Sequence, residues 1–228
     1  MIRFVLLDLD DTILDFLKTE AVALGKTLRR EGITPTDALI ERFSEINTAH
    51  WKRLEKGELT RLEVKRGRFQ CFFDELGVKT DVEAARLFYE QSISEGHIFI
   101  PGAQELLDAL YGKYRLFIVS NGSRSVQTGR IASAQIGRYF EAIFLSEDVG
   151  YDKPSVAFFD RCFAKIEGFD PKDAIIVGDS LTSDILGGIG AGIKTCWFNF
   201  RGRERDPSIT PDYEIDRLSA LIPLLHSI

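Results

Sequence analysis

The feature that most constrains the fold is a set of short, almost wholly apolar runs separated by helix-length segments. We expect strands at residues 2–7, 116–119, 142–145, 174–177 and 194–198. Between the later runs, the apolar spacing predicts helices near 103–112, 124–136, 155–167 and 182–191. Strands that alternate with helices imply right-handed crossovers and a parallel sheet that is buried on both faces. The pattern therefore predicts an α/β domain.

A long segment after the first strand has a different character. Residues 16–98 contain no comparable β-like run, and helix-period stretches there are separated by breakers at Gly32, Gly57 and Gly77. This segment predicts four helices. The first strand belongs to the same sheet as the later strands, so the helical block is an insertion into the α/β domain. We expect one domain of residues 1–15 and 99–228, and a second of residues 16–98.

Composition and charge exclude several classes of protein. The 228 residues are 44% hydrophobic and 28% charged, which is the balance of a globular protein and excludes a disordered one. A net charge of −6 argues against a nucleic-acid polymer as partner. No apolar run approaches the roughly 20 residues needed to cross a bilayer, and the N-terminus lacks the layout of a signal peptide. Three scattered cysteines fit free thiols, so we expect a cytoplasmic protein that interacts with no membrane.

Polar residues follow three of the predicted strands at the point where each strand ends. Asp8 and Asp10 follow the first strand, Ser120 follows the second, and Asp179 follows the run at 174–177. Ligands of open parallel sheets bind beyond the carboxyl ends of the strands. The topology thus brings these side chains to one edge of the sheet.

The spacing of the acidic residues indicates a cation. In an extended chain Asp8 and Asp10 point to the same side, and carboxylates gathered at one edge repel each other. With only three scattered histidines in the chain, a metal ion would be held by oxygen ligands, which favours Mg²⁺. Lys153 stands just before a predicted helix and supplies a second positive charge. A phosphate group fits between a magnesium ion and this lysine.

Each motif also has a structural interpretation. Asp10-Asp11-Thr12 could cap a helix, Ser120-Asn121-Gly122 could be a simple turn, and Lys153-Pro154 could only start a helix. Asp184 could be a solvated helix residue. The glycines of 187–192 resemble a dinucleotide fingerprint, but they lie between a helix and the following strand, so a helix end is the better interpretation. All four motifs together, each at a predicted strand end, favour a catalytic site.

The order Asp-x-Asp-x-Thr, Ser, Lys-Pro and Gly-Asp-Ser-x-x-x-x-Asp resembles the haloacid dehalogenase-like superfamily of phosphohydrolases, over nearly the whole chain. The resemblance implies a Rossmann-like three-layer α/β/α core with an inserted four-helix cap. It also implies that Asp8 is the nucleophile that becomes an aspartyl phosphate, and that Asp10 is the general acid and then the base. Mg²⁺ would be bound by Asp8, Asp179 and the backbone carbonyl of Asp10, with Asp184 supporting these ligands.

The same resemblance implies how the phosphoryl group is held. Ser120 would hydrogen-bond it, together with the backbone N–H groups of Asn121 and Gly122, and Lys153 would bridge it to the Asp8 carboxylate. The presence of Asp10 favours a phosphatase, because the dehalogenase branch of the superfamily lacks this second aspartate. The expected partner is a small phosphate ester, and the sequence does not give the oligomeric state.

The leaving group is less constrained. The segments 8–16 and 146–154 resemble those of bacterial 5′-nucleotidases, including enzymes for noncanonical pyrimidine nucleoside monophosphates, although phosphoglycolate and sugar-phosphate phosphatases share much of this likeness. In the helical block, Phe16, His50, Trp51 and Arg66 are candidates for contacting a base. Trp51 at helical spacing equally fits a helix core.

Two other kinds of protein could contain the same acidic residues without being phosphatases. A phosphorylatable receiver-like signalling module is a remote alternative, since receivers resemble chains near half this length with no helical insertion. Nothing in the sequence supports a catalytically inactive scaffold of the same fold, because all motif residues are present.

Overall fold

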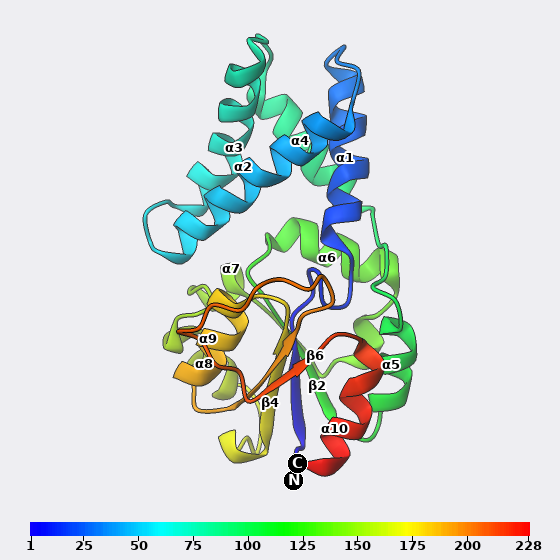
Figure 1. The fold of residues 1–228 in the computed structure, drawn as a ribbon, viewed down its shortest axis with the longest axis vertical. Helices are drawn as coiled ribbons and strands as arrows, with labels where there is room; N and C mark the ends of the chain where they lie inside the picture. Colours follow the sequence, from blue (N-terminus) through cyan, green and yellow to red (C-terminus); the bar gives the residue numbers. More distant parts are fainter. The chain divides into compact units, whose positions relative to one another are not determined.

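The computed structural model describes residues 1–228 and divides them into two compact units. One unit consists of residues 1–15 and 97–228, and the other consists of residues 16–96 (Figure 1). The segment from His97 belongs to the first unit because it pairs with the end of the N-terminal segment. The Asp15 N–H donates to Ile98 O at 2.7 Å, and the Ile100 N–H donates to Ile13 O at 3.0 Å.

The first unit is built on a six-stranded, wholly parallel sheet in the order β3-β2-β1-β4-β5-β6. Its strands are β1 (Phe4–Leu7), β2 (Arg115–Ser120), β3 (Ala142–Leu145), β4 (Ala174–Gly178), β5 (Lys194–Phe198) and β6 (Tyr213–Ile215). The five strands expected from the sequence are confirmed. The strand β6 was not predicted, because it is only three residues long and includes the exposed Glu214. The strand order reverses at β1, between β2 and β4, where open α/β sheets bind their ligands.

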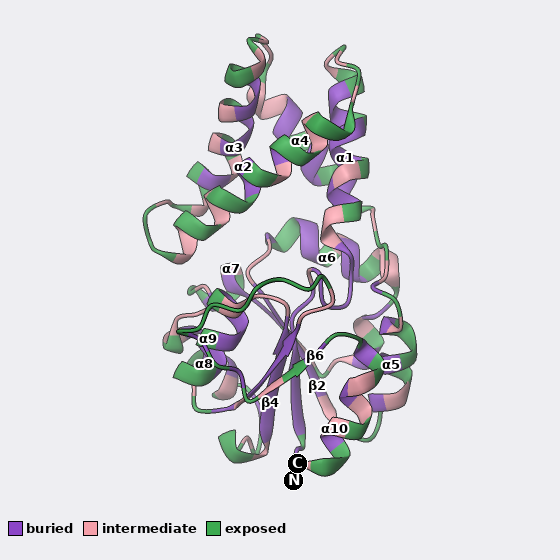
Figure 2. Cartoon of the chain, in the orientation of Figure 1, coloured by how far each residue is buried: buried purple, intermediate pink, exposed green.

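Helices cover both faces of this sheet, as the predicted three-layer fold requires. Alternate residues of β1 enter two separate apolar clusters, Val5 and Leu7 on one face and Phe4 and Leu6 on the other. Leucines of α5 and α10 complete the first cluster, and Phe158 of α8 lies in the second. Figure 2 shows β2 and β4 almost entirely buried, whereas β6 at the edge of the sheet is partly exposed. The helices are α5 (Ala103–Leu110), α6 (Arg124–Ala134), α7 (Ser146–Val149), α8 (Val156–Phe163), α9 (Leu186–Gly190) and α10 (Leu221–Ser227).

Short helical turns complete the first unit. A π-helical turn spans Leu181–Ile185 immediately before α9, and 3-10 turns span Gly137–Tyr139, Pro171–Asp173 and Leu218–Ala220. The glycine-rich run lies in α9 and at its end, where Gly192 has a φ of +71°. A Cβ at Gly188 would collide with Ile176 of β4 and Thr195 of β5. The run is therefore a helix end packed closely on the sheet, as predicted.

The second unit is the predicted four-helix block. Its helices are α1 (Phe16–Arg30), α2 (Asp37–Glu55), α3 (Arg61–Leu76) and α4 (Val82–Ser94). Thr36, Thr60 and Asp81 cap the N-termini of the last three, and Thr60 forms a reciprocal capping box with Glu63. The interior is aromatic: the Phe43 ring centroid lies 4.9 Å from that of Phe69. No helix in the structure is long and apolar enough to cross a membrane.

Candidate active site

The chain turns sharply where β1 ends. The Asp8 N–H still donates to Val177 O of β4 at 3.0 Å, and the Asp11 N–H then donates to Leu14 O at 2.8 Å. Asp11 has a φ of 54°, a left-handed conformation that aspartate tolerates better than most residues. This turn ends the strand at Asp8 and leaves its side chain at the carboxyl edge of the sheet.

A second turn follows β4 and brings two more carboxylates to the same edge. Asp179 directly follows Gly178, and Asp184 lies in the π-helical turn, where Ser180 N–H donates to its Oδ2 at 3.1 Å. A Cβ at Gly178 would collide with the Asp184 carboxylate, so only glycine allows this close packing. The Trp197 indole N–H of β5 donates to Asp179 O at 2.8 Å and holds the turn from the other side.

Lys153 lies between these carboxylates and is almost completely buried. Its Nζ donates to Asp8 Oδ1 at 2.7 Å, to Asp184 Oδ1 at 2.6 Å and to Val119 O at 2.8 Å. All three ammonium hydrogens therefore have acceptors. Burial opposes the charged form, but the ion pairs with Asp184 and Asp8 outweigh it and raise the pKa of Lys153. The side chain is a fixed positive charge at the edge of the sheet.

Asp8, Asp179 and Asp184 form a group in which one carboxylate oxygen of each residue lies within 4.8 Å of the other two. Burial raises the pKa of Asp8 well above its ordinary value, although Lys153 opposes the shift and Asp184 adds to it. Burial, with repulsion from Asp11 and Asp184, raises the pKa of Asp179 to about 7 against the attraction of Arg203. From the sequence, Asp184 is expected to support the metal ligands, and in the structure one of its carboxylate oxygens lies close to those of Asp8 and Asp179.

The charges around this group do not balance. Six carboxylates face four cationic side chains, each of which pairs with one or two of them. The carboxylates are those of Asp8, Asp10, Asp11, Asp15, Asp179 and Asp184, and the cations are Arg130, Lys153, Arg201 and Arg203. With all six carboxyl groups ionised the formal charge is −2, an excess of negative charge that favours either a bound cation or a retained proton. The donor atoms are all oxygens, and opposite ligands of one Mg²⁺ lie roughly 4 Å apart, so the group fits this ion.

The turn after β2 faces Lys153 directly. The Gly122 N–H donates to Ser120 Oγ at 3.0 Å. The Asn121 side chain donates to Lys153 O and accepts from the Lys153 N–H, both at 2.8 Å. The motif is a turn, as its structural interpretation predicts, and it also holds the backbone of the buried lysine.

Asp10 does not join the three-carboxylate group. Its oxygens instead accept hydrogen bonds from Gln127 and Arg130 of α6. The sequence analysis missed these two residues, because on a helix they read as solvent-facing positions. It also missed Arg201, which pairs with Asp11 and Asp15, and Arg203, which donates to Asp179 Oδ2 at 2.8 Å. Both arginines follow the end of β5, and this position could have predicted that they lie at the same edge of the sheet as the carboxylates.

The candidates in the four-helix unit lie outside its aromatic interior. Phe16 is the first residue of α1 and is partly exposed. The His50 ring bonds to Ile46 O at 2.8 Å, and the Trp51 ring has the Arg61 guanidinium 5.5 Å from its centroid. Arg66 is 60% exposed and lies 3.4 Å from Glu83. Contact of these four residues with a leaving group stays a prediction.

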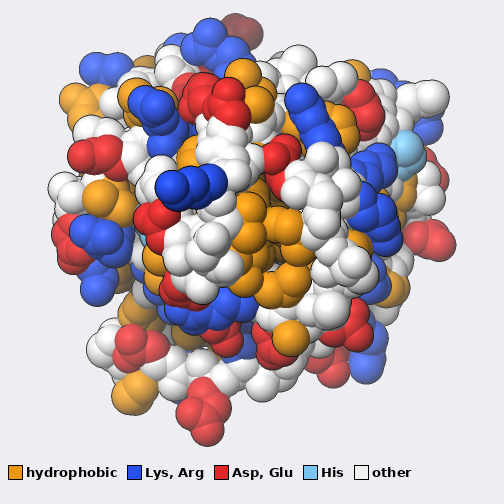
Figure 3. Space-filling model, turned by 90° about the horizontal axis from the view of Figure 1, so that it is seen from above, with side chains coloured by type: hydrophobic (Ala, Val, Ile, Leu, Met, Phe, Trp, Pro, Cys, Tyr) orange, Lys and Arg blue, Asp and Glu red, His pale blue; other side chains and the backbone are white.

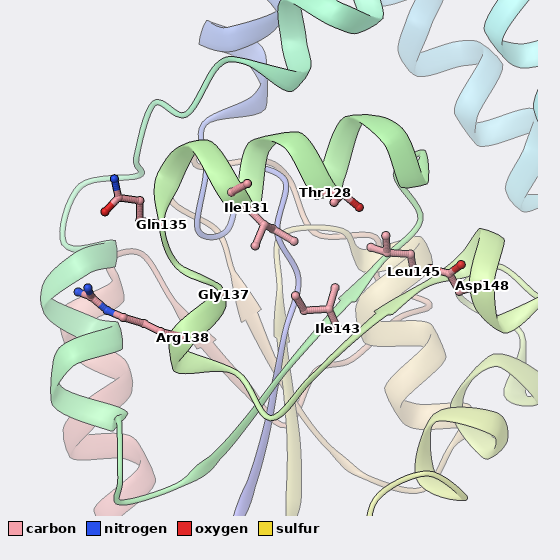
Figure 4. Close-up of a pocket in the computed structure, with 9 residues that line it drawn as sticks. Thr128, Ile131, Gln135, Gly137, Arg138, Ile143, Leu145 and Asp148 are labelled. Carbon is pink, nitrogen blue, oxygen red and sulfur yellow. The ribbon is translucent and has the colours of Figure 1, made fainter.

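A separate pocket of about 470 Å³ lies on the other side of α6. Figure 4 shows Thr128 and Ile131 of α6 above Ile143 and Leu145 of β3, with Asp148 at one end. None of the site residues expected from the sequence lines it. On the face of the molecule shown in Figure 3, acidic and basic side chains are interspersed, and neither sign forms a continuous patch.

Comparison with known proteins adds independent findings. Residues 5–198 match the family described as haloacid dehalogenase-like hydrolase. The chain is 38% identical over 224 residues to YfnB of Bacillus subtilis, covering 98% of this chain and 95% of YfnB. It is 34% identical to the pyrimidine 5′-nucleotidase PynA of Streptococcus pneumoniae, covering 98% of this chain and 94% of PynA. It is 30% identical to the pyrimidine 5′-nucleotidase YjjG of Escherichia coli, covering 97% of both chains.

Solved structures of other proteins resemble this one over nearly the whole chain. The crystal structure of YfnB superposes with a TM-score of 0.94 and covers 98% of both chains. That structure is described as bound to magnesium and as revealing interdomain movement.

Proposed function

The chain belongs to the haloacid dehalogenase-like hydrolase family and is a phosphohydrolase of that family, and from this premise we propose that it is a Mg²⁺-dependent pyrimidine 5′-nucleotidase. The observation that carries the proposal is the buried Lys153, which holds Asp8 and Asp184 beside Asp179 at the end of the sheet. The whole-length likeness to PynA and YjjG supports the nucleotide as substrate.

The phosphoryl group binds at the turn after β2. Lys153 Nζ lies beside Asp8, and one of its present hydrogen bonds shifts to the phosphoryl oxygens when the ester binds. The Ser120 hydroxyl and the Asn121 N–H add neutral donors, and the Gly122 N–H, which donates to Ser120 Oγ in this structure, turns to the phosphoryl group. The Asn121 side chain holds this turn against the Lys153 backbone through two hydrogen bonds before substrate arrives.

Asp8 then attacks phosphorus. A bond forms between the carboxylate oxygen and phosphorus while the bond from phosphorus to the nucleoside 5′-oxygen breaks, and Asp10 gives its proton to that leaving oxygen. In the second step, the Asp10 carboxylate takes a proton from the water that attacks the aspartyl phosphate. Inorganic phosphate leaves, Asp8 is again a carboxylate, and Asp10 again holds a proton.

Asp8, Asp179 and the backbone carbonyl of Asp10 would hold the Mg²⁺. When bound, this ion offsets the negative charge that nucleophile and ester share. Asp184 keeps Lys153 in place and closes the Ser180 turn through its two oxygens.

The substrate claim is tested with a panel of phosphate esters in the presence of Mg²⁺. We expect UMP and dTMP to exceed phosphoglycolate and hexose phosphates in kcat/KM. The reverse ranking would replace the nucleotidase with a phosphoglycolate or sugar-phosphate phosphatase of the same fold. Variants Phe16→Ala, Trp51→Ala and Arg66→Ala, assayed on UMP and on p-nitrophenyl phosphate, test whether the helical unit reads the base. A selective loss on UMP supports that role.

A receiver-like module would retain its phosphoryl group instead of releasing it repeatedly. Multiple turnovers of phosphate release per chain would exclude that alternative. A single stoichiometric phosphorylation would favour it.

A further inference from the structure

The carboxylate of Asp10 is held by two side chains of α6. Gln127 Nε2 donates to Asp10 Oδ2 at 2.6 Å and also to Ser120 Oγ at 2.8 Å. Arg130 Nη1 donates to Asp10 Oδ1 and to Gln127 Oε1, the latter at 3.1 Å. One amide thus connects the carboxylate of Asp10 with the serine of the phosphate-binding turn, and one guanidinium supports both partners.

The burial of these groups is uneven. The Arg130 side chain is fully buried and Gln127 is 1% exposed, whereas the Asp10 side chain remains 30% exposed. Burying a guanidinium costs free energy unless a carboxylate pairs with it. The carboxylate of Asp10 is the partner that offsets this cost for Arg130. Side chains of α6 contact the Asp10 carboxylate from one direction. The exposed part of the carboxylate remains accessible to a reacting group.

The backbone places the two residues with little freedom. Gln127 and Arg130 are three residues apart and therefore lie on one face of α6. The Gln127 N–H donates to Ser123 O at 2.9 Å in the first turn of the helix. A Cβ at Gly122 would collide with the Gln127 side chain, so the glycine of the turn leaves room for the amide that reaches Ser120 and Asp10.

We propose that Gln127 and Arg130 are positioning residues that fix the direction of the Asp10 carboxylate relative to the phosphoryl group. The inference rests on the proposed function, in which Asp10 donates a proton to the leaving oxygen as the bond to phosphorus breaks. A protonated Asp10 carboxyl group that is held at a preset angle transfers this proton without first losing rotamer freedom. A purely structural ion pair would hold α6 on the sheet and have no preference among substrates.

The two roles differ in how they depend on the leaving group. Protonation matters for a nucleoside 5′-oxygen, which is a poor leaving group as an alkoxide, and matters little for p-nitrophenolate, which delocalises its charge. The parameter kcat/KM reports on steps up to the transfer of the phosphoryl group to Asp8. A defect in positioning Asp10 therefore lowers kcat/KM selectively for the alkyl ester.

The variants Gln127→Leu and Arg130→Met remove the donors and keep most of the side-chain volume. We expect kcat/KM for UMP, or for the best alkyl phosphate of the panel, to fall by about 10- to 100-fold. For p-nitrophenyl phosphate we expect a loss below roughly threefold. Arg130→Lys should recover part of the loss on the alkyl ester. Equal losses on both substrates would overturn the inference. Arg138→Met, in the 3-10 turn at the far end of the pocket, is the matched control and should change neither value.

A double-mutant cycle tests directly whether Gln127 acts through Asp10. If Gln127 acts through Asp10, Gln127→Leu should have almost no further effect on UMP turnover in an Asp10→Asn background. Additive losses would contradict the inference. Should Arg130→Met fail to fold by circular dichroism, Gln127→Leu, Arg130→Lys and the cycle decide the question.

The same measurements separate this inference from the function on which it rests. Asp10→Asn alone must show the selective loss on the alkyl ester. If it does not, the acid role of Asp10 fails. If it does and the Gln127 and Arg130 variants do not, only the positioning role fails.

Discussion

The two units of the chain bury charged side chains in different ways. In the four-helix unit, two buried glutamates and two buried arginines balance each other, namely Glu20, Glu90, Arg68 and Arg86. Asn47 connects them, because it donates to Glu20 Oε1 and accepts from Arg68, both at 2.7 Å. At the end of the sheet, six carboxylates face only four cations. A balanced network can organise a helical interior, whereas the excess of carboxylates at the sheet is relieved by a bound cation or by protonation.

This difference indicates where to look for chemistry in a chain with many buried ions. Both regions contain carboxyl groups whose pKa is raised by burial, such as Glu20 in the helical unit and Asp179 at the sheet. A shifted pKa therefore does not distinguish them. The excess of negative charge does, together with the approach of three carboxylate oxygens to one point.

The largest effect is expected from the nucleophile. Asp8→Asn should lower kcat on the order of 10⁴-fold or more, because the amide cannot form the acyl phosphate. Phosphate release under saturating substrate is the measurement, and circular dichroism should show an intact fold. Asp160→Asn, at an exposed position of α8, is the control and should keep full activity. Turnover retained by Asp8→Asn would remove the covalent mechanism.

Metal binding should stabilise only the unbalanced region. At a Mg²⁺ concentration about 100 times its Kd, the free energy of unfolding should rise by about 2.7 kcal/mol. Thermal unfolding with Mg²⁺ and with a chelator measures this difference. Asp179→Asn should abolish it, and Glu90→Gln in the helical unit should leave it unchanged. A Mg²⁺ effect that survives Asp179→Asn would place the ion elsewhere.

Two glycines test the packing of the two units. Gly178→Ala should lower the free energy of unfolding by about 1–3 kcal/mol, because the new methyl group displaces the Asp184 carboxylate. Gly25→Ala in α1 should raise it by about 0.5–1 kcal/mol, since its nearest neighbour is the flexible end of Arg29 at 3.5 Å. Urea denaturation measures both. Equal changes in the two variants would contradict the special packing at the sheet end.

The affinity for Mg²⁺ should depend on pH through Asp179. In the metal-free protein the pKa of Asp179 is raised to about 7, so below that pH a proton must leave before the carboxylate can bind the ion. We expect affinity to be constant above about pH 8 and to fall roughly tenfold per pH unit well below 7. The fluorescence of Trp197, whose indole donates to Asp179 O, can follow the titration in a Trp51→Phe background. A flat profile would disprove the coupling.

The smallest effect is expected in the balanced network. Burial raises the pKa of Glu20, while hydrogen bonds from Ser44 and Tyr89 oppose the shift. Its contribution to stability is thus complete below the ordinary glutamate pKa and is lost as pH rises through the raised value. Glu20→Gln removes this pH dependence. The change in the free energy of unfolding caused by the substitution should therefore be more favourable at neutral pH than in mild acid, by about 1 kcal/mol or less. Urea denaturation of the unsubstituted chain and of Glu20→Gln at each pH measures this difference. A variant that is less favourable at neutral pH than in mild acid would show that Glu20 is needed as an anion.

The strands and the motif residues could be predicted because their signals are local. A fully apolar run such as Phe4–Leu7 has few alternatives to a buried strand, and parallel strands present their carboxyl ends at one edge. Asp8, Ser120 and Asp179 follow from that rule, whereas Lys153 was predicted from its position just before a helix. The strand β6 and the helices α7 and α10 were missed, because elements of three to seven residues carry too few turns for a recognisable period.

The roles of Gln127, Arg130 and Arg203 depended on the tertiary structure. In the sequence each of them is an ordinary polar residue of a helix or loop. The packing of α6 against the turn after β1 places Gln127 and Arg130 against Asp10. The return of the β5–β6 segment places Arg203 against Asp179. The amino-acid sequence by itself determined the sheet, the inserted helical unit and which side chains meet at the strand ends, because periodicity and strand direction are properties of the chain. Which cation faces each carboxylate was decided by packing, since electrostatic energies depend on distances that no spacing in the sequence specifies.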